Sequence, residues 1–271
     1  MKLAYTISAS PTRFAAVGQG RDVRSAIEYL AALGYAGAEL AIRDPAEVNL
    51  DEVAATAARA LVVVPAIGTG QAFLEEGIAL AAAEEEVRER AVARLEAQVD
   101  AAGRLGALVI VGLIHGPIPP QVPRDQAMEW LLAGLRRVAR RARGANVRIV
   151  IEPVNRYESN WLNTVEEVLD LIGRLGEDNV GVLPDTFHMN IEEADMFEAL
   201  RRARPRLWHL HVADSNRRAP GAGHLDFNQI AIALAGQGYT GAVSAEILPY
   251  PTLEAAAAQT LRVMEPLLAP V

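Results

Sequence analysis

The chain of 271 residues is long enough for one large domain, since α/β barrels commonly run to about 250 residues. Its net charge of −8 disfavours nucleic acid as a partner, and its 51% hydrophobic content is ordinary for a globular protein with a sizeable core. The absence of cysteine excludes disulfides, thiol nucleophiles and zinc–thiolate sites.

The first residues, "MKLAYTISASPTRF", lack the long apolar segment of a signal peptide, and no run reaches the roughly 18 apolar residues that a membrane span needs. We therefore expect a buried first strand, no membrane association and a cytoplasmic protein. Lys2 is the only lysine and stands at the start of the chain, so a lysine-dependent aldolase is not expected.

Short apolar runs rich in β-branched residues recur along the chain and are mostly continuous, which is typical of parallel strands covered on both faces. They predict strands over residues 2–8, 35–41, 60–67, 107–114, 147–154, 180–187, 207–214 and 241–248. Between them, amphipathic patterns predict helices over 23–34, 84–106, 125–143, 164–176, 226–238 and 252–268, and a short one over 194–203. Gly34 suits a helix C-cap, and Thr164 with Glu167 forms a capping box.

Eight strands alternating with helices are the count of a (β/α)8 TIM barrel, an α/β fold. The alternative, a doubly wound open sheet, usually has a Gly-rich turn after its first strand, and "ISASPTRF" is not one. No linker or low-complexity stretch divides the chain. We expect a single barrel domain over residues 1–271, with the active site at the C-terminal ends of the strands.

Several predicted strands reach residues that are able to do chemistry. The fifth to eighth strands reach Glu152, Asp185, His211 and Glu246, about one βα unit apart, and the second reaches Glu39. Each acid alone suits a turn or an N-cap, and His211 alone suits the core. Together at one end of a barrel they would repel one another without a cation, because buried charges cost several kcal/mol each. Three carboxylates and one imidazole suit Mn²⁺, Mg²⁺ or Co²⁺.

Further polar residues lie in the loops after the fourth to seventh strands: His115, Glu158, His188, Arg217 and Arg218. Among these, His115 and Arg218 are compatible with ordinary loop residues. His209 lies two positions before His211, so it shares the inward direction and is expected in the core or beside a metal ligand. His224 is expected in a loop.

Four segments resemble the ketose 3-epimerases, the D-tagatose and D-psicose 3-epimerase group of the xylose-isomerase-like TIM barrels. They are "EPVNRYE" (152–158), "DTFHMNIEE" (185–193), "HVADSNRRAPGAGH" (211–224) and the glutamate of "AEI" (245–247). The first half is similar through "IGTGQAFLEEG" (67–77) and the strand rhythm. The loop "LIHGPIPP" lacks the aromatic residue that this resemblance leads us to expect near the far end of the sugar.

The resemblance implies a metal-dependent isomerase that epimerises C3 of a free ketose, and a homodimer or homotetramer. Its metal would be Mn²⁺, with Co²⁺ or Mg²⁺ as alternatives. The implied metal ligands are Glu152, Asp185, His211 and Glu246, and the implied contacts to the sugar near O1 and O2 are Glu158, His188 and Arg217.

In the implied mechanism O2 and O3 of the ketose bind the metal, which acidifies the C3 proton. One glutamate removes that proton to give a cis-enediolate, which His188 and Arg217 help to stabilise, and a second glutamate returns a proton to the opposite face. Glu152 and Glu246 are the candidate catalytic pair.

Alternative functions use the same site differently. An aldose–ketose isomerase resembling hydroxypyruvate isomerase would move the proton between C1 and C2, and a sugar-phosphate isomerase or epimerase would place Arg217 and Arg218 on a phosphate. An endonuclease IV-like phosphodiesterase would want more histidine ligands than five histidines supply. Its phosphate contacts would be an arginine-rich helix face with Arg136, Arg137, Arg140, Arg141 and Arg143. A non-catalytic sugar-binding protein would not need a metal flanked by two glutamates.

Overall fold

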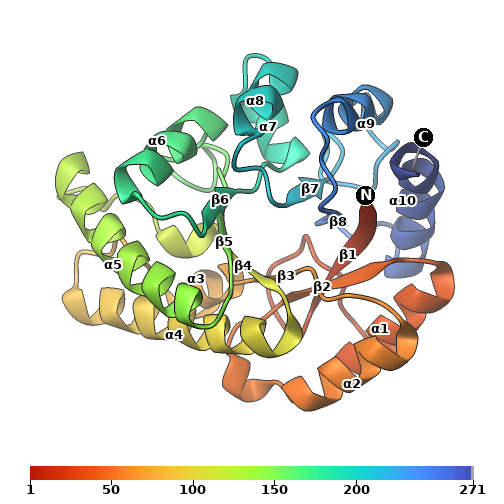
Figure 1. The fold of residues 1–271 in the computed structure, drawn as a ribbon, viewed down its shortest axis with the longest axis horizontal. Helices are drawn as coiled ribbons and strands as arrows, with labels where there is room; N and C mark the ends of the chain where they lie inside the picture. Colours follow the sequence, from red (N-terminus) through yellow and green to blue (C-terminus); the bar gives the residue numbers. More distant parts are fainter. Residues whose placement is uncertain (270–271) are drawn as a thin grey trace.

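In the computed structural model, which describes residues 1–269, eight parallel strands form a barrel (Figure 1). The strands are β1 (Lys2–Ser8), β2 (Gly37–Ala41), β3 (Ala66–Gly68), β4 (Leu108–Val111), β5 (Ile149–Ile151), β6 (Val180–Val182), β7 (Leu210–Val212) and β8 (Ala242–Ala245). Their order is β6-β5-β4-β3-β2-β1-β8-β7. Isolated bridges from Val182 to Leu207 and from Asp185 to His211 join β6 to β7 and close the barrel. The predicted (β/α)8 fold is confirmed, and the open sheet is excluded.

The helices lie outside the strands and cover the barrel (Figure 1). They are α1 (Val23–Leu33), α2 (Leu50–Ala60), α3 (Gly70–Glu76), α4 (Glu85–Leu105), α5 (Arg124–Gly144), α6 (Val165–Leu175), α7 (Thr186–Glu192), α8 (Met196–Ala203), α9 (Phe227–Gly236) and α10 (Leu253–Leu268). Two 3₁₀ turns add η1 (Pro45–Glu47) and η2 (Leu113–His115). The amino group of Met1 donates to the Leu268 carbonyl at 3.3 Å, so β1 begins beside the end of α10.

Apolar side chains fill both sides of the strands, which explains the continuous apolar runs of the sequence. The larger core lies between the strands and the helices. A smaller cluster lies apart from it and consists of Ala66, Leu108, Ile110, Val150 and Leu183, with Trp208 packed against it. These residues lie in β3, β4 and β5, directly after β6 and just before β7. Buried polar residues of β1, β2, β7 and β8 gather elsewhere in the fold: Thr6, Glu39, His209, His211 and Ser244.

The first strand is confirmed at Lys2–Ser8, whereas β4 to β8 end earlier than predicted, at the face that carries the site. β6 stops at Val182, and Asp185, predicted within the strand, is instead the N-cap of α7, its side chain accepting from the Phe187 amide at 2.8 Å. The strand predicted over 60–67 is largely wrong, because Ala60 ends α2 and only Ala66–Gly68 pairs as β3. Residues that follow the hydrogen-bonded part of a strand at the C-terminal face are still apolar, so the hydrophobic pattern of the sequence overestimates the length of the strands.

Three helices, α2, α3 and α7, were not predicted. α2 is alanine-rich, so its apolar stripe is weak, and α3 and α7 have seven residues each. Other local predictions are confirmed, namely the C-cap at Gly34 and the capping box of Thr164 with Glu167. That residues 1–271 form one domain stays a prediction, and residues 270 and 271 lie outside the described part.

Candidate metal centre

The four side chains predicted at the ends of the fifth to eighth strands meet in one cluster. Ligand atoms of Glu152, Asp185, His211 and Glu246 all lie within 4.8 Å of one another. Glu152 directly follows β5, Glu246 directly follows β8, and His211 is the central residue of β7. The four residues thus come from four consecutive strands or the loops directly after them. They lie at the C-terminal face of the barrel, where active sites of this fold lie.

Local structure fixes these positions. The His211 amide donates to the Pro184 carbonyl at 3.0 Å, which sets Asp185 beside β7. Thr186 adds a second connection between the segment after β6 and β7. Its hydroxyl donates to the Ala213 carbonyl at 2.6 Å and accepts from the Ala213 amide at 2.9 Å. At Gly112, a Cβ atom would lie 2.5 Å from Glu152 Oε2, so glycine leaves the space that this carboxylate occupies.

The cluster carries buried polar atoms that lack a hydrogen-bond partner in the described protein. They are Glu152 Oε1, Asp185 Oδ2 and His211 Nδ1. Leaving such an atom unpaired costs about 1–3 kcal/mol or more, and carboxylate oxygens with one imidazole nitrogen are the ligand set of hard divalent cations. The residues present therefore form a buried site able to hold a metal ion.

Burial also raises the proton affinity of two of these carboxyl groups. Desolvation, with the nearby charge of Glu152 in support, raises the pKa of Asp185 to about 6 and that of Glu246 to about 8. Glu246 keeps only 12% of its side chain exposed. Without a cation, these two groups hold their protons more tightly than a free carboxyl does.

Glu39 sets the orientation of His211. The Nε2 atom of His211 donates to Glu39 Oε1 at 2.8 Å, and His209 Nε2 donates to the other oxygen at 2.5 Å. Burial alone would raise the pKa of Glu39, but the two histidines outweigh it and hold that pKa well below its usual range. Burial likewise opposes a charge on His211, yet Glu39 and Glu152 outweigh it and raise its pKa.

Because Nε2 of His211 faces Glu39, Nδ1 is the ring atom that faces the cluster, 3.3 Å from Glu152 Oε1. A carboxylate behind a metal-binding histidine fixes its tautomer and raises its basicity. Glu39, His209 and His211 are themselves close enough to hold an ion, but hydrogen bonds already join their facing atoms. His209 is fully buried and contacts Glu39, as expected of a core residue beside His211.

The three predicted substrate contacts line one cavity with Glu152, His211 and Glu246. Arg217 reaches Glu158 Oε1 with Nη1 at 2.7 Å and Glu246 Oε2 with Nη2 at 3.3 Å. Its backbone has a φ of 58°, in the left-handed region, so the loop after β7 holds this arginine in an uncommon conformation.

His188 is a neutral hydrogen-bond donor toward this cavity. Its Nδ1 accepts from Asn155 Nδ2 at 2.7 Å and from the Asn155 amide at 3.3 Å, so the ring proton is on Nε2. Burial, together with the charges of Arg217 and His211, lowers its pKa well below the usual value. Nε2 lies 3.9 Å from Asp185 Oδ2, beside the cluster.

The remaining polar loop residues lie apart from these contacts. His115 is buried in η2 against Trp161 rather than in an ordinary loop, and burial lowers its pKa to about 4. The guanidinium of Arg218 lies 3.8 Å from the centre of the Tyr250 ring. His224 is an exposed loop residue, as predicted.

Sequence reasoning did not assign a role to Asn155, Gly112, Gln71 or Asp214. Asn155 stands inside the segment "EPVNRYE", so its position was visible but its bond to His188 was not. Gly112 directly follows β4, at the place where β5 and β8 present Glu152 and Glu246. A glycine at a strand end is a signal for close approach of another group.

Residues 27–267 match the model of the xylose isomerase-like TIM barrel family. The chain belongs to this family. The resemblance noted from the sequence is therefore confirmed at the level of the family. Among the described residues, no helix is both long and apolar enough to cross a membrane.

Individual relatives are sugar epimerases. The chain is 37% identical to a D-psicose 3-epimerase of Agrobacterium fabrum over 59% of its own length and 57% of the relative, so that alignment spans just over half of the relative. It is 34% identical to an L-ribulose 3-epimerase of Mesorhizobium japonicum over 79% of this chain and 71% of the relative. The crystal structure of D-psicose 3-epimerase with D-tagatose from Clostridium cellulolyticum H10 superposes with a TM-score of 0.84, 25% identity and full coverage of both chains.

Proposed function

We propose that this protein is a metal-dependent ketose 3-epimerase acting on a free ketose. The observation that carries the proposal is the cluster of Glu152, Asp185, His211 and Glu246, whose ligand atoms lie within 4.8 Å of one another. Three of these residues, Glu152, His211 and Glu246, line a cavity together with Arg217 and His188. The names of the relatives, D-psicose and L-ribulose 3-epimerase, support the substrate class.

The proposed ligands are one oxygen from each of the three carboxylates and Nδ1 of His211. Their hardness favours Mn²⁺, with Co²⁺ or Mg²⁺ as alternatives. A cation held there would polarise the C2 carbonyl of the sugar and acidify the hydrogen on C3. Proton transfer and the orientation of the sugar would be carried out by side chains of the protein.

Epimerisation without redox needs one group to take the C3 proton and another to return a proton on the opposite face. Glu152 and Glu246 come from β5 and β8, three strands apart, and are the proposed pair. Arg217 and the Nε2–H of His188 would donate to the sugar oxygens where negative charge develops, since both line the cavity beside the carboxylates. Glu158 would hold Arg217 and contact the sugar near O1 and O2.

The site favours a free sugar over a phosphate. Glu158 and Glu246 already pair with Arg217, and these two carboxylates would repel a phosphate dianion placed beside it. Arg218 lies over the Tyr250 ring and does not line the cavity. Three of the five arginines on the arginine-rich helix face, Arg137, Arg141 and Arg143, pair with carboxylates. This pairing argues against the phosphodiesterase alternative.

A panel of C4 to C6 ketoses, incubated with and without Mn²⁺ or Co²⁺, tests the proposal. We expect C3 epimers to form, and their formation to stop after chelation and resume when Mn²⁺ is restored. Chromatography separates the outcomes: aldose products would instead support the isomerase alternative, and the absence of any turnover would support a binding protein.

A substitution tests the catalytic pair. Because Glu246→Gln removes the group that exchanges a proton with C3 from one face, we expect it to abolish exchange of the C3 hydrogen with solvent deuterium, measured by NMR. Asp195→Asn, at the N-cap of α8 away from the cavity, serves as control. Undiminished exchange in Glu246→Gln would remove this residue from the mechanism. The homodimer or homotetramer and the cytoplasmic location stay predictions.

A further inference from the structure

The cavity has two chemically different halves. The half that follows β5 to β8 carries the metal cluster and its charged neighbours. The half that follows β1 to β4 is lined mainly by Phe14, Ile110, Leu113 and small residues, and its polar side chains are Thr69 and Gln71. The hydroxyl of Thr69 donates its hydrogen to the Ile110 carbonyl, at 2.7 Å.

The amide of Gln71 has a defined orientation. Its Nε2 lies 2.8 Å from Ser8 Oγ, and that hydroxyl donates its own hydrogen to the Ser10 carbonyl. Since Ser8 Oγ has no second hydrogen, the Gln71 atom that faces it must be the donor, Nε2. Oε1 is therefore the atom left for another partner.

That oxygen has no partner among the described residues. Gln71 is 1% exposed, and its Oε1 is buried without a hydrogen bond. Other cavity-lining residues with such orphaned atoms are Glu152, His211 and Arg217, all in the metal-side half. Among the described residues that line the apolar half, Gln71 is thus the one with a buried acceptor atom that lacks a donor.

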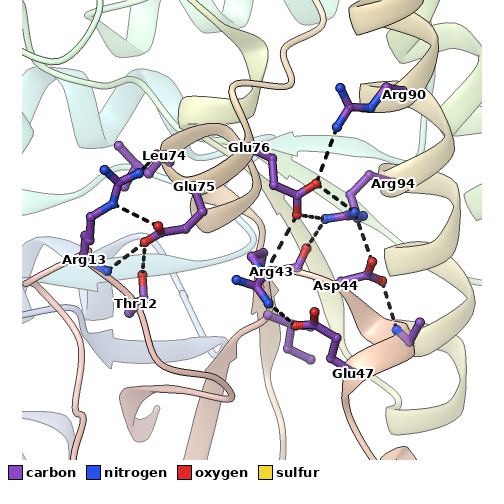
Figure 2. A network of polar contacts seen from close by, with 12 residues as sticks. Thr12, Arg13, Arg43, Asp44, Glu47, Leu74, Glu75, Glu76, Arg90 and Arg94 are labelled. Carbon is purple, nitrogen blue, oxygen red and sulfur yellow. Dashed lines mark hydrogen bonds and ion pairs between the residues drawn. The ribbon is translucent and has the colours of Figure 1, made fainter.

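The helix that carries Gln71 is tied down at its far end. Glu75 accepts from the Arg13 amide at 2.7 Å and from Thr12 Oγ1 at 3.0 Å, which fastens α3 to the loop after β1 (Figure 2). Glu76 pairs with Arg94 of α4 at 2.7 Å (Figure 2). Contacts on two sides therefore hold the C-terminal end of α3, the short helix that carries Gln71. An acceptor on a rigid element is what discrimination between substrates requires.

We infer that Gln71 Oε1 accepts a hydrogen bond from a hydroxyl group on the part of a ketose beyond C3, and that this bond selects substrates by chain length. The inference rests on the proposed function, which places C2 and C3 at the metal-side half of the cavity. The rest of the sugar then extends toward β1 to β4, where hydroxyl groups are the donors that a sugar offers. An apolar wall with one buried acceptor rejects a chain that cannot supply that donor.

The experiment compares two substrates that differ beyond the reacting carbons. D-psicose carries C4 to C6, whereas dihydroxyacetone ends at C3 and reports only on proton exchange at the reacting end. We expect Gln71→Leu to lower the ratio of kcat/KM for D-psicose to the deuterium-exchange rate for dihydroxyacetone about tenfold. Ser8→Ala keeps Gln71 but frees its amide to turn, so it lowers the same ratio by a smaller factor and provides a milder second variant.

Gln98→Leu is the matched control. Gln98 on α4 is also fully buried, donates Nε2 to a carbonyl (Ile42, at 2.7 Å) and has an orphaned Oε1, but it lies outside the cavity lining. Its ratio should equal that of the wild type. An unchanged ratio in Gln71→Leu, or an equal fall in Gln98→Leu, overturns the inference.

If the wild-type protein turns over neither substrate, the proposed epimerase function fails, and calorimetric titration with D-psicose decides the inference separately. Weaker binding in Gln71→Leu than in Gln98→Leu supports the contact. Equal binding in the two variants refutes it.

Discussion

His211 has a different partner on each ring nitrogen, and this asymmetry decides what it can do. Nε2 is committed to Glu39, which is itself shared with His209, and Thr6 donates to the same carboxylate at 3.1 Å. Nδ1 is left facing Glu152. The buried Glu39 carboxylate thus holds the His211 ring in one orientation and one tautomer, with Nδ1 toward the four-residue cluster that could hold a metal ion.

Glu39→Gln tests this role. A glutamine can still accept from one histidine but no longer carries the negative charge that supports both, so we expect Mn²⁺ to bind roughly 10- to 100-fold more weakly. Competition with a chelator measures the affinity. Thr6→Val, which removes a neighbouring donor and leaves both histidine contacts, should change it far less, and unchanged affinity in Glu39→Gln would show that Glu39 is only a core residue.

The loop between β7 and α9 is organised around one buried carboxylate. Asp214 Oδ1 accepts from the amides of Ser215 at 2.7 Å and Leu225 at 3.2 Å, and Oδ2 accepts from Gly221 at 2.8 Å. The carbonyl of Asp214 accepts from the Arg217 amide at 2.8 Å. Asp214 therefore closes the loop that keeps Arg217 in its left-handed conformation and over the cavity.

Gly223 leaves the room for this arrangement. A Cβ there would lie 2.2 Å from Asp214 Oδ1 and 2.4 Å from Ser215 Oγ. We expect Gly223→Ala to displace the loop and with it Arg217, raising KM for a ketose severalfold while Mn²⁺ affinity stays near the wild-type value. Gly236→Ala, whose Cβ meets nothing within 4 Å at the end of α9, is the matched control. A normal KM in Gly223→Ala would separate the loop from substrate binding.

The barrel as a whole closes at its weakest pairing. β6 and β7 are joined through isolated bridges, whereas the other neighbouring strands pair over continuous registers. The cluster of Glu152, Asp185, His211 and Glu246 takes Asp185 from the β6 side and His211 from β7, so it spans this junction. A cation bound there would link both sides and stabilise the folded state by mass action.

A bound cation should therefore stabilise the folded protein, whereas a rise in pH should destabilise the metal-free protein. In the metal-free protein the pKa is about 6 for Asp185 and about 8 for Glu246, above the values of unfolded carboxyl groups. A carboxyl group of this kind binds its proton more tightly when folded, so its stabilising contribution is present at low pH and lost as pH rises through the folded value. We expect the metal-free melting temperature to fall as the pH rises from about 4.5, near the unfolded pKa, to about 8, the folded pKa of Glu246.

With Mn²⁺ the trend should reverse, because the cation and the protons compete for the same carboxylates and deprotonation at higher pH favours the metal. Thermal unfolding followed by circular dichroism, with chelator or with Mn²⁺, measures both trends. Asp185→Asn removes one titrating group and should flatten the metal-free curve. A metal-free melting temperature that rises with pH would contradict the assignment of these two groups.

Order and spacing along the chain are enough to predict the barrel and the meeting of four chemically active side chains at one of its faces. Continuous apolar runs at regular spacing predict a parallel sheet wrapped by helices, and residues such as Glu152 and Glu246 fall where such strands end. Parallel strands of one barrel place their C-terminal ends on one face, so four chemical side chains at successive ends had to converge. This inference needs only order and spacing along the chain.

The orientation of those side chains, and the neighbours that contact them, follow from packing between distant parts of the chain and cannot be read from order and spacing. Glu39 and His211 are 172 positions apart, and nothing local in either segment specifies their contact. The same holds for Asp185, which both caps α7 and faces the cluster, and for Gln71, whose free oxygen follows from its bond to Ser8, 63 positions away. Such pairings depend on packing across the whole barrel, because side-chain direction is set by all the elements that meet there.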